Sequence, residues 1–281
     1  MRALITGAGG LVATALVQHF DDVLALKHAA LDISNKAAVD EVVTRLTPDV
    51  IINCAVISVD DCERDPARAQ RINVDGPGYL ADAAEGIGAA IVHFSSNYVF
   101  DGKPVKGEPY TIHDEAHPIN VYGRTKLLGE HAVTAASRRA FIIRTSWIYG
   151  PGKSNFLGTV AAKLKRGEPV QAIGDTWAST TYVADLAHRV REIIDRKTFG
   201  TYHVVNDGVC SQESFARCAA ELADVPPEVA VRLIEVVSEA SMGREAPRPP
   251  WTPMRCLLSG QIGLTPLRSW EQALAVYVAT H

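Results

Sequence analysis

The sequence predicts an α/β protein built on a doubly wound parallel sheet, and three observations support this fold class. Short apolar runs alternate with amphipathic helical patterns through the first half of the chain, as in successive β–α–β units. A glycine-rich turn directly follows the first apolar run. With 281 residues and 47% hydrophobic content, the chain is long enough for a large core and for one or two domains.

The first apolar run, residues 2–6, leads into a glycine turn and then into a helical pattern that continues to Phe20. Gly7 permits a tight turn, Gly10 lets a pyrophosphate approach the backbone, and Ala13 is small enough for helix and strand to pack closely. Free N–H groups at a helix start favour phosphate. This arrangement predicts a Rossmann-type dinucleotide site, with an ordinary glycine turn as the alternative. The residues expected against the cofactor are Gly7, Gly10, Leu11 and Val12.

The second apolar run, residues 23–26, ends where an NAD-selective site usually carries Asp or Glu for the ribose 2′-hydroxyl. Lys27 and His28 stand there instead. A carboxylate would repel the 2′-phosphate of NADP, whereas a lysine attracts it. The sequence therefore predicts NADPH as the cofactor, with NADH possible and a solvated surface lysine as the alternative for Lys27. Asp32 and Ile33 follow, where they are expected to cover the adenine.

The third apolar run, residues 49–53, ends at the carboxyl edge of the sheet, where open α/β sheets bind ligands. Cys54 is expected to line the pocket rather than act as a nucleophile, since no His lies near it in the sequence. Residues 60–85 are helical in character, with Pro66 restarting a helix and Asn73 placed to brace the active-site strand. The cofactor contacts expected from this edge are Asn53, Cys54 and Ala55.

The fourth apolar run, residues 90–94, is followed by Ser95 and Ser96, and a helical pattern opens at Tyr122. Tyr122 and Lys126 are four residues apart, so they share one face of a helix. A nearby ammonium is expected to lower the pKa of a phenol from its reference value of about 10. We therefore expect Tyr122 to pass a proton to a forming alkoxide and Ser96 to hydrogen-bond the same oxygen. A chance YxxxK pattern is the alternative reading.

Beyond residue 150 the regular alternation loosens. Residues 1–150 are assigned to the dinucleotide-binding domain, and elements at about 183–205 are expected to return to its sheet. Residues 151–281 are assigned mainly to a smaller, discontinuous substrate-binding domain. Within that domain, residues 231–236 alternate in part and are expected to form a strand.

Composition argues against several classes of function. The net charge is −4 and basic residues are scattered, so no nucleic-acid surface is expected. No apolar stretch is long enough to span a membrane, and the five cysteines without a secretory signal favour reduced thiols in the cytoplasm. His113 and His117 flank two acidic residues, but a solvated loop is expected there rather than a metal site.

Six colinear segments are similar to a known family, and they extend over nearly the whole chain. These segments are Gly7–Ala13, Arg45–Asn53, Ser95–Gly102, Pro118–Lys126, Arg144–Tyr149 and Asn155–Phe156. Through them the chain resembles the extended short-chain dehydrogenase/reductase family and, more narrowly, the dTDP-4-dehydrorhamnose reductase family. The resemblance implies a catalytic triad of Ser96, Tyr122 and Lys126, with Tyr122 as proton donor and Lys126 holding the nicotinamide ribose.

The resemblance also implies the reaction, in which NADPH reduces the C4 ketone of a nucleotide-linked 6-deoxy-4-ketohexose. Trp147 would stack on the substrate or pack in the core, and Arg248, in an Arg-Pro motif, would bind a diphosphate or lie on the surface. The implied substrate contacts are Asn97, Tyr98, Trp147, Asn155 and Arg248. Ser95 and Thr145, at strand ends, are expected at the cofactor.

Two alternatives share this fold. One is a non-catalytic NADP-binding subunit that resembles the regulatory β subunit of methionine adenosyltransferase. The other is a nucleotide-sugar epimerase or dehydratase with tightly bound NAD. The chain also departs from the family pattern near the substrate at Asn97, Thr176 and Thr180. A homodimer is compatible with the resemblance, although Ala15 stands where some members carry a Glu that helps a metal bridge the dimer.

Overall fold

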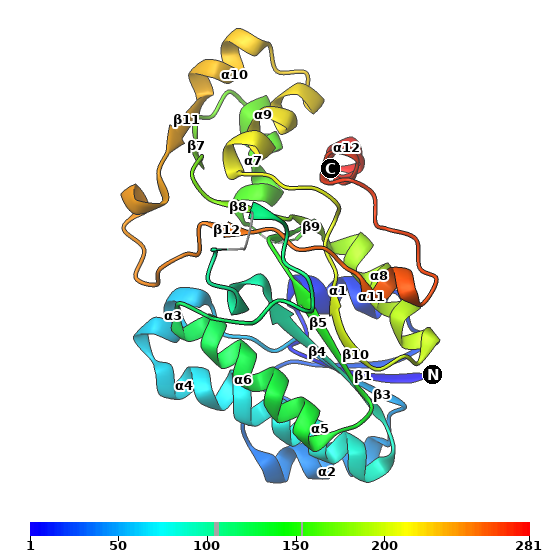
Figure 1. Cartoon of the computed structure of the whole chain (residues 1–281). Helices are drawn as coiled ribbons and strands as arrows, with labels where there is room; N and C mark the ends of the chain where they lie inside the picture. Colours follow the sequence, from blue (N-terminus) through cyan, green and yellow to red (C-terminus); the bar gives the residue numbers. More distant parts are fainter. Residues whose placement is uncertain (104–106, 153) are drawn as a thin grey trace.

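A six-stranded parallel sheet forms the centre of the computed structural model, which describes residues 1–103, 107–152 and 154–281. Its strand order is β2-β1-β3-β4-β5-β10, and every neighbouring pair is parallel (Figure 1). This confirms the predicted doubly wound sheet. The strands are β1 (Arg2–Thr6), β2 (Asp22–Leu26), β3 (Val50–Asn53), β4 (Ala90–Ser96), β5 (Ala140–Thr145) and β10 (Gly200–His203).

Helices cover both faces of this sheet. α1 (Leu11–Val17) and α8 (Val183–Arg196) pack on the face that carries Ile5 and Ile52. α2 (Lys36–Leu46), α5 (Gly76–Ile87) and α6 (Val121–Ala136) cover the other face, which carries Leu4 and Ile51. Neighbouring residues of one strand thus point into opposite cores, which explains why β3 and β5 are buried along their whole length and are apolar except at their carboxyl ends.

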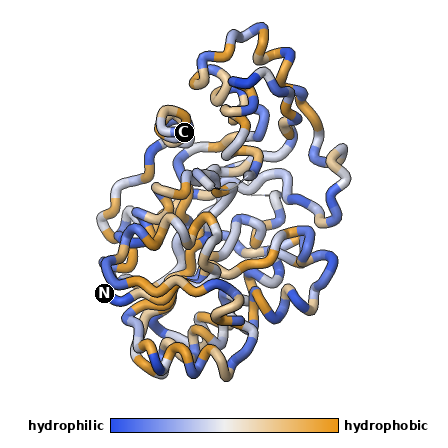
Figure 2. The backbone as a smooth tube through the Cα atoms, turned by 180° about the vertical axis from the view of Figure 1, so that it is seen from behind, coloured by the Kyte–Doolittle hydropathy of each residue, from blue (hydrophilic) through white to orange (hydrophobic). Residues whose placement is uncertain are grey.

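The hydrophobic segments follow this layering along the chain. Figure 2, seen from behind, shows mostly hydrophobic backbone where the parallel strands run side by side near the N-terminus. The edge strand β2 is less buried than the others, with three of its five residues exposed and two of intermediate exposure. The core therefore sits between β1, β3, β4 and β5 and their helices, and the carboxyl ends of these strands are left free for a ligand.

The helical stretch after β3 is broken into four pieces, as the predicted restart at Pro66 requires. α3 (Val59–Arg64) ends before Asp65, whose side chain accepts from the N–H of Arg68 at 2.9 Å and caps α4 (Pro66–Gln70). A π-helical turn, η1 (Arg71–Asp75), joins α4 to α5. Such insertions into helices are frequent at functional sites.

A second, smaller lobe lies over the carboxyl end of the sheet (Figure 1). Its hydrophobic core is formed mainly by α7 (Phe156–Lys165), α9 (Gln212–Leu222) and α12 (Trp270–Thr280), around the fully buried Tyr149. Three two-stranded parallel pairs complete it. They are β6 (Ile148–Tyr149) with β9 (Thr181–Tyr182), β7 (Val170–Ile173) with β11 (Ile234–Val237), and β8 (Trp177–Ala178) with β12 (Trp251–Thr252).

The strand expected at residues 231–236 is partly wrong. Residues up to Leu233 belong to α10 (Pro227–Leu233), and the strand β11 begins only at Ile234. Pro227 sits at the first turn of α10, where its fixed φ favours a helix. By contrast, α8 and β10 pack against the sheet as expected, although both follow residue 150. The division into two domains stays a prediction, and α11 (Leu258–Gln261) also lies against β10.

Candidate active site

A cavity of about 300 Å³ opens at the carboxyl edge of the sheet. It lies where the strand order reverses between β1 and β3, which is the position at which open α/β sheets bind ligands. Most of the residues predicted for catalysis and cofactor binding meet there. The predicted residues that line it are Gly10, Leu11, Val12, Cys54, Ala55, Ser95, Ser96, Asn97, Tyr122, Lys126, Thr145 and Trp147.

The glycine turn after β1 brings its backbone against the end of β3. Gly7 has φ +70°, and a Cβ there would lie 2.7 Å from the backbone of both Cys54 and Ala55. Its carbonyl accepts from the N–H of Gly10 at 3.2 Å, which closes the turn. The N–H groups of Leu11 and Val12 follow in the first turn of α1, where no carbonyl of the helix can reach them. The turn therefore presents free backbone donors to the cavity.

Ser96 ends β4 and its hydroxyl is held by neighbours. Its Oγ accepts from the N–H of Tyr98 at 3.2 Å and donates to the Oδ1 of Asn97 at 3.1 Å. Asn97 begins the short helix η2 (Asn97–Val99), and its amide donates to the Oγ1 of Thr252 in β12 at 2.7 Å. Asn97 thus links the end of β4 to the smaller lobe.

Tyr122 reaches Ser96 because α6 starts in close contact with η2. The side chain of Asn120 caps α6 by accepting from the N–H of Gly123 at 2.7 Å. A Cβ at Gly123 would lie 2.0 Å from the carbonyl oxygen of Tyr98, so only glycine fits. The ring of Tyr122 meets that of Tyr98 edge-on at 5.9 Å between centroids. Burial raises the pKa of Tyr122 to about 12, and the nearby Ser96 hydroxyl acts in the opposite direction.

Lys126 lies one turn further along α6 and is only 2% exposed. Burial lowers the pKa of its ammonium to about 8, against the attraction of the Glu130 carboxylate. Its Nζ lies 3.5 Å from the Nε2 of His93. The expected lowering of the Tyr122 pKa by Lys126 is therefore wrong for the free protein, because desolvation of the phenol outweighs any attraction from an ammonium that is itself destabilised.

Asn53 lies below the cavity rather than on its wall. It is 1% exposed, and its Oδ1 accepts from the Thr6 hydroxyl at 2.8 Å and from the Ala55 N–H at 3.2 Å. Its Nδ2 lies 3.3 Å from the Nδ1 of His93. The side chain predicted to touch the cofactor instead connects the ends of β1 and β3 to the middle of β4.

Asn73 braces a helix rather than the active-site strand for which it was predicted. Its amide donates to the Oγ1 of Thr125 at 3.0 Å and to the thiol sulfur of Cys62 at 3.5 Å. A Cβ at Gly129 would lie 2.2 Å from the Asn73 carbonyl oxygen. The π-turn around Asn73 therefore packs directly on α6, close to Lys126, because the glycine permits backbone contact.

A buried ion pair beside the cavity was missed by sequence reasoning. Arg144 at the end of β5 donates to both carboxylate oxygens of Glu130, at 2.9 and 2.7 Å, and Ser95 donates to the same carboxylate. Ser95 thus lines the cavity, but its hydroxyl is engaged elsewhere. The available signal was a charged or titratable residue inside an apolar strand, which describes both Arg144 and His93.

The residues predicted for the adenosine end lie away from the 300 Å³ cavity. Lys27 is exposed, and a Cβ at Gly9 would lie 3.8 Å from its Cε, so it reaches over the glycine turn. The Asp32 carboxylate accepts from the N–H and hydroxyl of Ser34. Ile33 is 4% exposed and packs on Gly76 at the start of α5. A separate cavity of about 180 Å³ is lined by His28, Asp32, Ser34, Arg68, Arg71 and Ile72.

The residues predicted for the substrate are divided between places. Trp147 lines the large cavity and also a small one of about 30 Å³, which Tyr98 and Arg248 share. Trp147 has φ +37°, a left-handed conformation that costs free energy for a large side chain and is found at functional sites. Asn155 lines neither cavity. It caps α7, where its Oδ1 accepts from the N–H of Gly158 at 2.8 Å.

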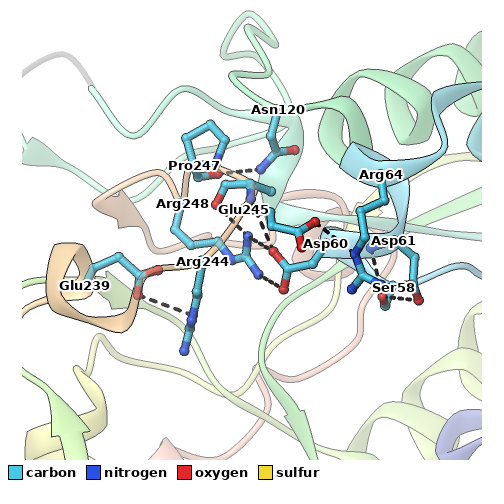
Figure 3. A network of polar contacts seen from close by, with 11 residues as sticks. Ser58, Asp60, Asp61, Arg64, Asn120, Glu239, Arg244, Glu245, Pro247 and Arg248 are labelled. Atoms are coloured by element: carbon cyan, nitrogen blue, oxygen red, sulfur yellow. Dashed lines mark hydrogen bonds and ion pairs between the residues drawn. The ribbon is translucent and has the colours of Figure 1, made fainter.

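Arg248 already has strong partners. Its guanidinium donates to both oxygens of Asp60 in α3, at 3.0 and 2.8 Å, and to the Ala246 carbonyl at 2.7 Å (Figure 3). Figure 3 shows further links around it, with Glu245 accepting from Arg64 at 2.8 Å. The guanidinium group of Arg248 therefore holds residues 244–248 against α3 and is not free to bind a diphosphate.

Other expectations concern metals, thiols and membranes. In residues 1–103, 107–152 and 154–281, no three His, Cys, Asp or Glu side chains are grouped to hold a metal, and His117 pairs with Glu115 at 3.3 Å. All five cysteines are free thiols, and burial raises the pKa of Cys54. No helix in the described part of the chain has the length and apolar character needed to cross a bilayer.

Comparisons with known proteins find similar families, relatives and structures over nearly the full chain. The family model described as the RmlD substrate binding domain matches residues 1–281. A dTDP-4-dehydrorhamnose reductase from Mycolicibacterium smegmatis is 38% identical over 285 residues, covering 99% of this chain and 85% of that protein. A probable dTDP-4,6-dihydroxy-2-methyloxan-3-one 4-ketoreductase from Streptomyces antibioticus is 33% identical, covering 98% and 93%. A dTDP-4-dehydrorhamnose reductase from Bacillus anthracis, solved with NADP, has a TM-score of 0.92 at 33% identity, covering 100% of this chain and 99% of that one.

Proposed function

The chain belongs to the RmlD substrate binding domain family, and we propose that it is an NADPH-dependent oxidoreductase that reduces the C4 ketone of dTDP-4-dehydrorhamnose or a closely related dTDP-4-keto-6-deoxy sugar. Membership of this family confirms the resemblance drawn from the sequence. Several relatives that match over nearly full length are named as reductases of such substrates.

One observation carries the proposal. Ser96 from β4 and Tyr122 and Lys126 from α6 converge on one cavity, which the glycine turn also lines. A regulatory subunit that only binds a dinucleotide would need the turn but not a phenol and an amine aimed at the same space. The intact constellation therefore favours catalysis over a binding role.

The residues present fit a dinucleotide. The tight contact of Gly7 with the end of β3 leaves no room for a side chain at this turn. The free N–H groups of Leu11 and Val12 would bind the pyrophosphate, and Lys126 would hold the nicotinamide ribose. The exposed Lys27, which reaches over the turn, supports a cofactor with a 2′-phosphate. When bound, NADPH supplies the hydride.

The proton would come from Tyr122. With a pKa of about 12 the phenol is protonated at neutral pH, so it can donate its O–H to the C4 oxygen as negative charge develops there. The Ser96 hydroxyl, which donates to Asn97 in the free protein, would turn to hydrogen-bond the same oxygen. This second donor would hold the carbonyl in line with the phenol.

The smaller lobe would bind the sugar nucleotide. Trp147 lies between the two cavities, and Tyr98 and Asn97 extend the wall toward β12. These positions support the predicted substrate contacts for the three residues. For Arg248, contact with a diphosphate would require its pair with Asp60 to open or to share the guanidinium. Asn155 would act indirectly by placing α7.

The test is to incubate purified protein with NADPH and dTDP-4-dehydrorhamnose and to follow the nicotinamide absorbance. We expect loss of NADPH that depends on the sugar, and a reduced hexose with one new C4 stereocentre by NMR. Tightly bound NAD in the purified protein with no net oxidation of NADPH would point to an epimerase. NADPH binding with no turnover on any dTDP-4-keto sugar would point to a regulatory subunit, and either result would overturn the proposal.

The predicted partners and cellular location of the protein have less support than its reaction. A nucleotide-sugar substrate agrees with the named relatives. The homodimer and the cytoplasmic location stay predictions, and sedimentation of the purified protein and fractionation of the source cell would measure them.

A further inference from the structure

His93 is a buried titratable residue whose role the proposed reaction does not include. It lies in β4, directly behind the cavity, and has no exposed surface. Its two ring nitrogens face different partners, with Nδ1 3.3 Å from the Asn53 amide and Nε2 3.5 Å from the amine of Lys126. Burial lowers the pKa of His93 well below its ordinary value, so the ring is neutral and carries one proton.

The position of that proton follows from the partners of Asn53. The backbone N–H of Ala55 can only donate, and it points at Oδ1 of Asn53 at 3.2 Å. The Thr6 hydroxyl points at the same oxygen at 2.8 Å. Oδ1 is thus fixed as the acceptor end of the amide, and Nδ2 must donate to the Nδ1 of His93. The proton of the neutral ring therefore sits on Nε2.

The Nε2–H of His93 then points toward the amine of Lys126. A neutral amine offers a lone pair that can accept this N–H, whereas an ammonium offers only more hydrogens. The contact therefore stabilises the neutral form of the amine and destabilises the charged form. We propose that His93 is a positioning residue for Lys126, and that the chain Thr6–Asn53–His93 fixes the ring tautomer that favours release of the lysine proton.

The other charged and titratable groups near Lys126 do not replace this contact. Glu130 lies one turn away on α6 and favours the ammonium, but both its oxygens are bound by Arg144. Cys54, directly after β3, and Cys62 in α3 also lie near the amine, and burial raises the pKa of each thiol, so both stay neutral. Tyr122 is protonated at neutral pH. His93 is the neighbour with a hydrogen-bond contact to the amine nitrogen within the described residues.

This inference rests on the proposed function for its consequence. When Tyr122 gives its proton to the substrate oxygen, the phenolate must be reprotonated. An amine with a lowered pKa is the stronger acid, so it gives its proton to the phenolate, whose conjugate acid has a pKa of about 12, with a larger driving force than an ordinary lysine with a pKa of about 10.4. Through His93, Lys126 would thus serve as a proton donor to Tyr122 in addition to holding the nicotinamide ribose.

The first experiment reads the tautomer directly in the wild-type protein without cofactor. Histidine is labelled with ¹⁵N in the ring, and two-bond ¹H–¹⁵N spectra distinguish a protonated Nε2 from a protonated Nδ1. The His93 signal is identified by its absence from the H93F variant. We expect the Nε2–H form throughout the neutral range. A proton on Nδ1, or on both nitrogens, would overturn the proposal.

The second experiment follows the protonation of Lys126 by ¹³C NMR of the Cε carbon, assigned with a Lys126→Met variant. We expect a midpoint near 8 in the wild type. In N53D, the new carboxylate accepts from Nδ1–H, so Nε2 becomes an acceptor for the ammonium, and the midpoint should rise by about one pH unit or more.

A double-variant cycle separates the tautomer from the added charge. In an H93F background, N53D acts on Lys126 only through space, so its effect on the midpoint should be less than about half of that in the parent. Equal effects in both backgrounds would contradict the proposal. These measurements need no substrate, so they can fail while the reductase assignment stands, and the converse also holds. If the protein is a reductase, the alkaline limb of its kcat/KM profile should move upward in N53D with the Lys126 midpoint.

Discussion

On the cofactor side of the cavity, Thr6, Asn53 and His93 reach one another across adjacent strands and all are at most 1% exposed. On the substrate side, Arg248 reaches Asp60 across 188 residues of sequence, and the side chain of Asp60 is 33% exposed. The first group is fixed by the register of a parallel sheet. The second is fixed by ion pairs between a C-terminal segment and α3.

This difference has an energetic consequence. Water cannot reach the hydrogen bonds between these buried side chains of neighbouring strands. Losing one of them leaves a buried polar group without a partner, which costs free energy of folding. Ion pairs that are partly exposed are screened by salt and contribute little each. We infer that the cofactor side is rigid and preorganised, whereas the substrate side can be opened by modest changes in charge, salt or pH.

The largest expected effect tests the rigid side. In Tyr122→Phe the proton donor is lost, so turnover with NADPH should fall by about 10²–10⁴. NADPH affinity, measured by fluorescence titration, should stay within about threefold, because the ring is retained. Turnover close to wild type would mean that another group delivers the proton.

The next effect tests backbone contact between η1 and α6. In Gly129→Ala the new methyl group would lie 2.2 Å from the Asn73 carbonyl, and the free energy of unfolding in urea should fall by about 1–3 kcal/mol. Gly86→Ala is the matched control, since nothing lies within 4 Å of its Cβ position in α5. That variant should gain up to about 1 kcal/mol from helix propensity. Equal effects at both positions would show that this contact is not tight.

The third effect tests the substrate side. Asp60→Asn removes the charge that pairs with Arg248, so we expect a loss of about 1 kcal/mol in stability and a severalfold rise in KM for the sugar nucleotide. The affinity for NADPH should not change. A rise in the Kd of NADPH equal to the rise in KM would show that the two sides are not independent.

The same pair has a pH dependence of known sign. The Arg248 guanidinium holds the pKa of the Asp60 carboxyl below its ordinary value of 3.8. Since the folded pKa is the lower one, the stabilisation is present above about pH 4 and is lost as the pH falls through the folded value. The gap in urea midpoint between wild type and Asp60→Asn should therefore hold from neutral pH down to about pH 4 and narrow as the pH falls further. A constant gap would assign the effect to something other than charge.

The smallest expected effect concerns the choice of cofactor. Lys27 is exposed, so its attraction for a 2′-phosphate should be modest. In Lys27→Ala the ratio of kcat/KM for NADPH to that for NADH should fall by about two- to fivefold. Lys36→Ala is the control, because Lys36 is an exposed lysine that pairs with Asp40 and Asp82. An equal change in both variants would reflect general charge rather than a local contact.

The cofactor side was largely predictable from sequence because its parts are local. Glycines after a first strand and polar residues at strand ends mark the carboxyl edge of a parallel sheet, whatever the rest of the chain does. Tyr122 and Lys126 share a helix, so their spacing alone placed them together. The misjudged property there was the pKa of Tyr122, because the burial of Tyr122 and Lys126 depends on neighbours outside their own helix.

The substrate side was less predictable because its contacts are not local. The partner of Arg248 comes from α3, and no periodicity in the sequence marks Asp60 as that partner. Asn155 was predicted as a substrate contact, but it caps α7, a role that its position before an apolar helical run also favours. His93 was hidden in an apolar strand, where a neutral histidine is easily taken for ordinary core.

The place of β10 in the sheet has a consequence for biosynthesis. This strand is made of residues 200–203, yet it pairs with β5 along residues 141–144. A ribosome must therefore complete the first two hundred residues or so before the last strand can join the six-stranded sheet. A fragment cut after residue 150 would expose the unpaired edge of β5, which is fully buried in the whole protein, and we expect such a fragment to aggregate rather than fold.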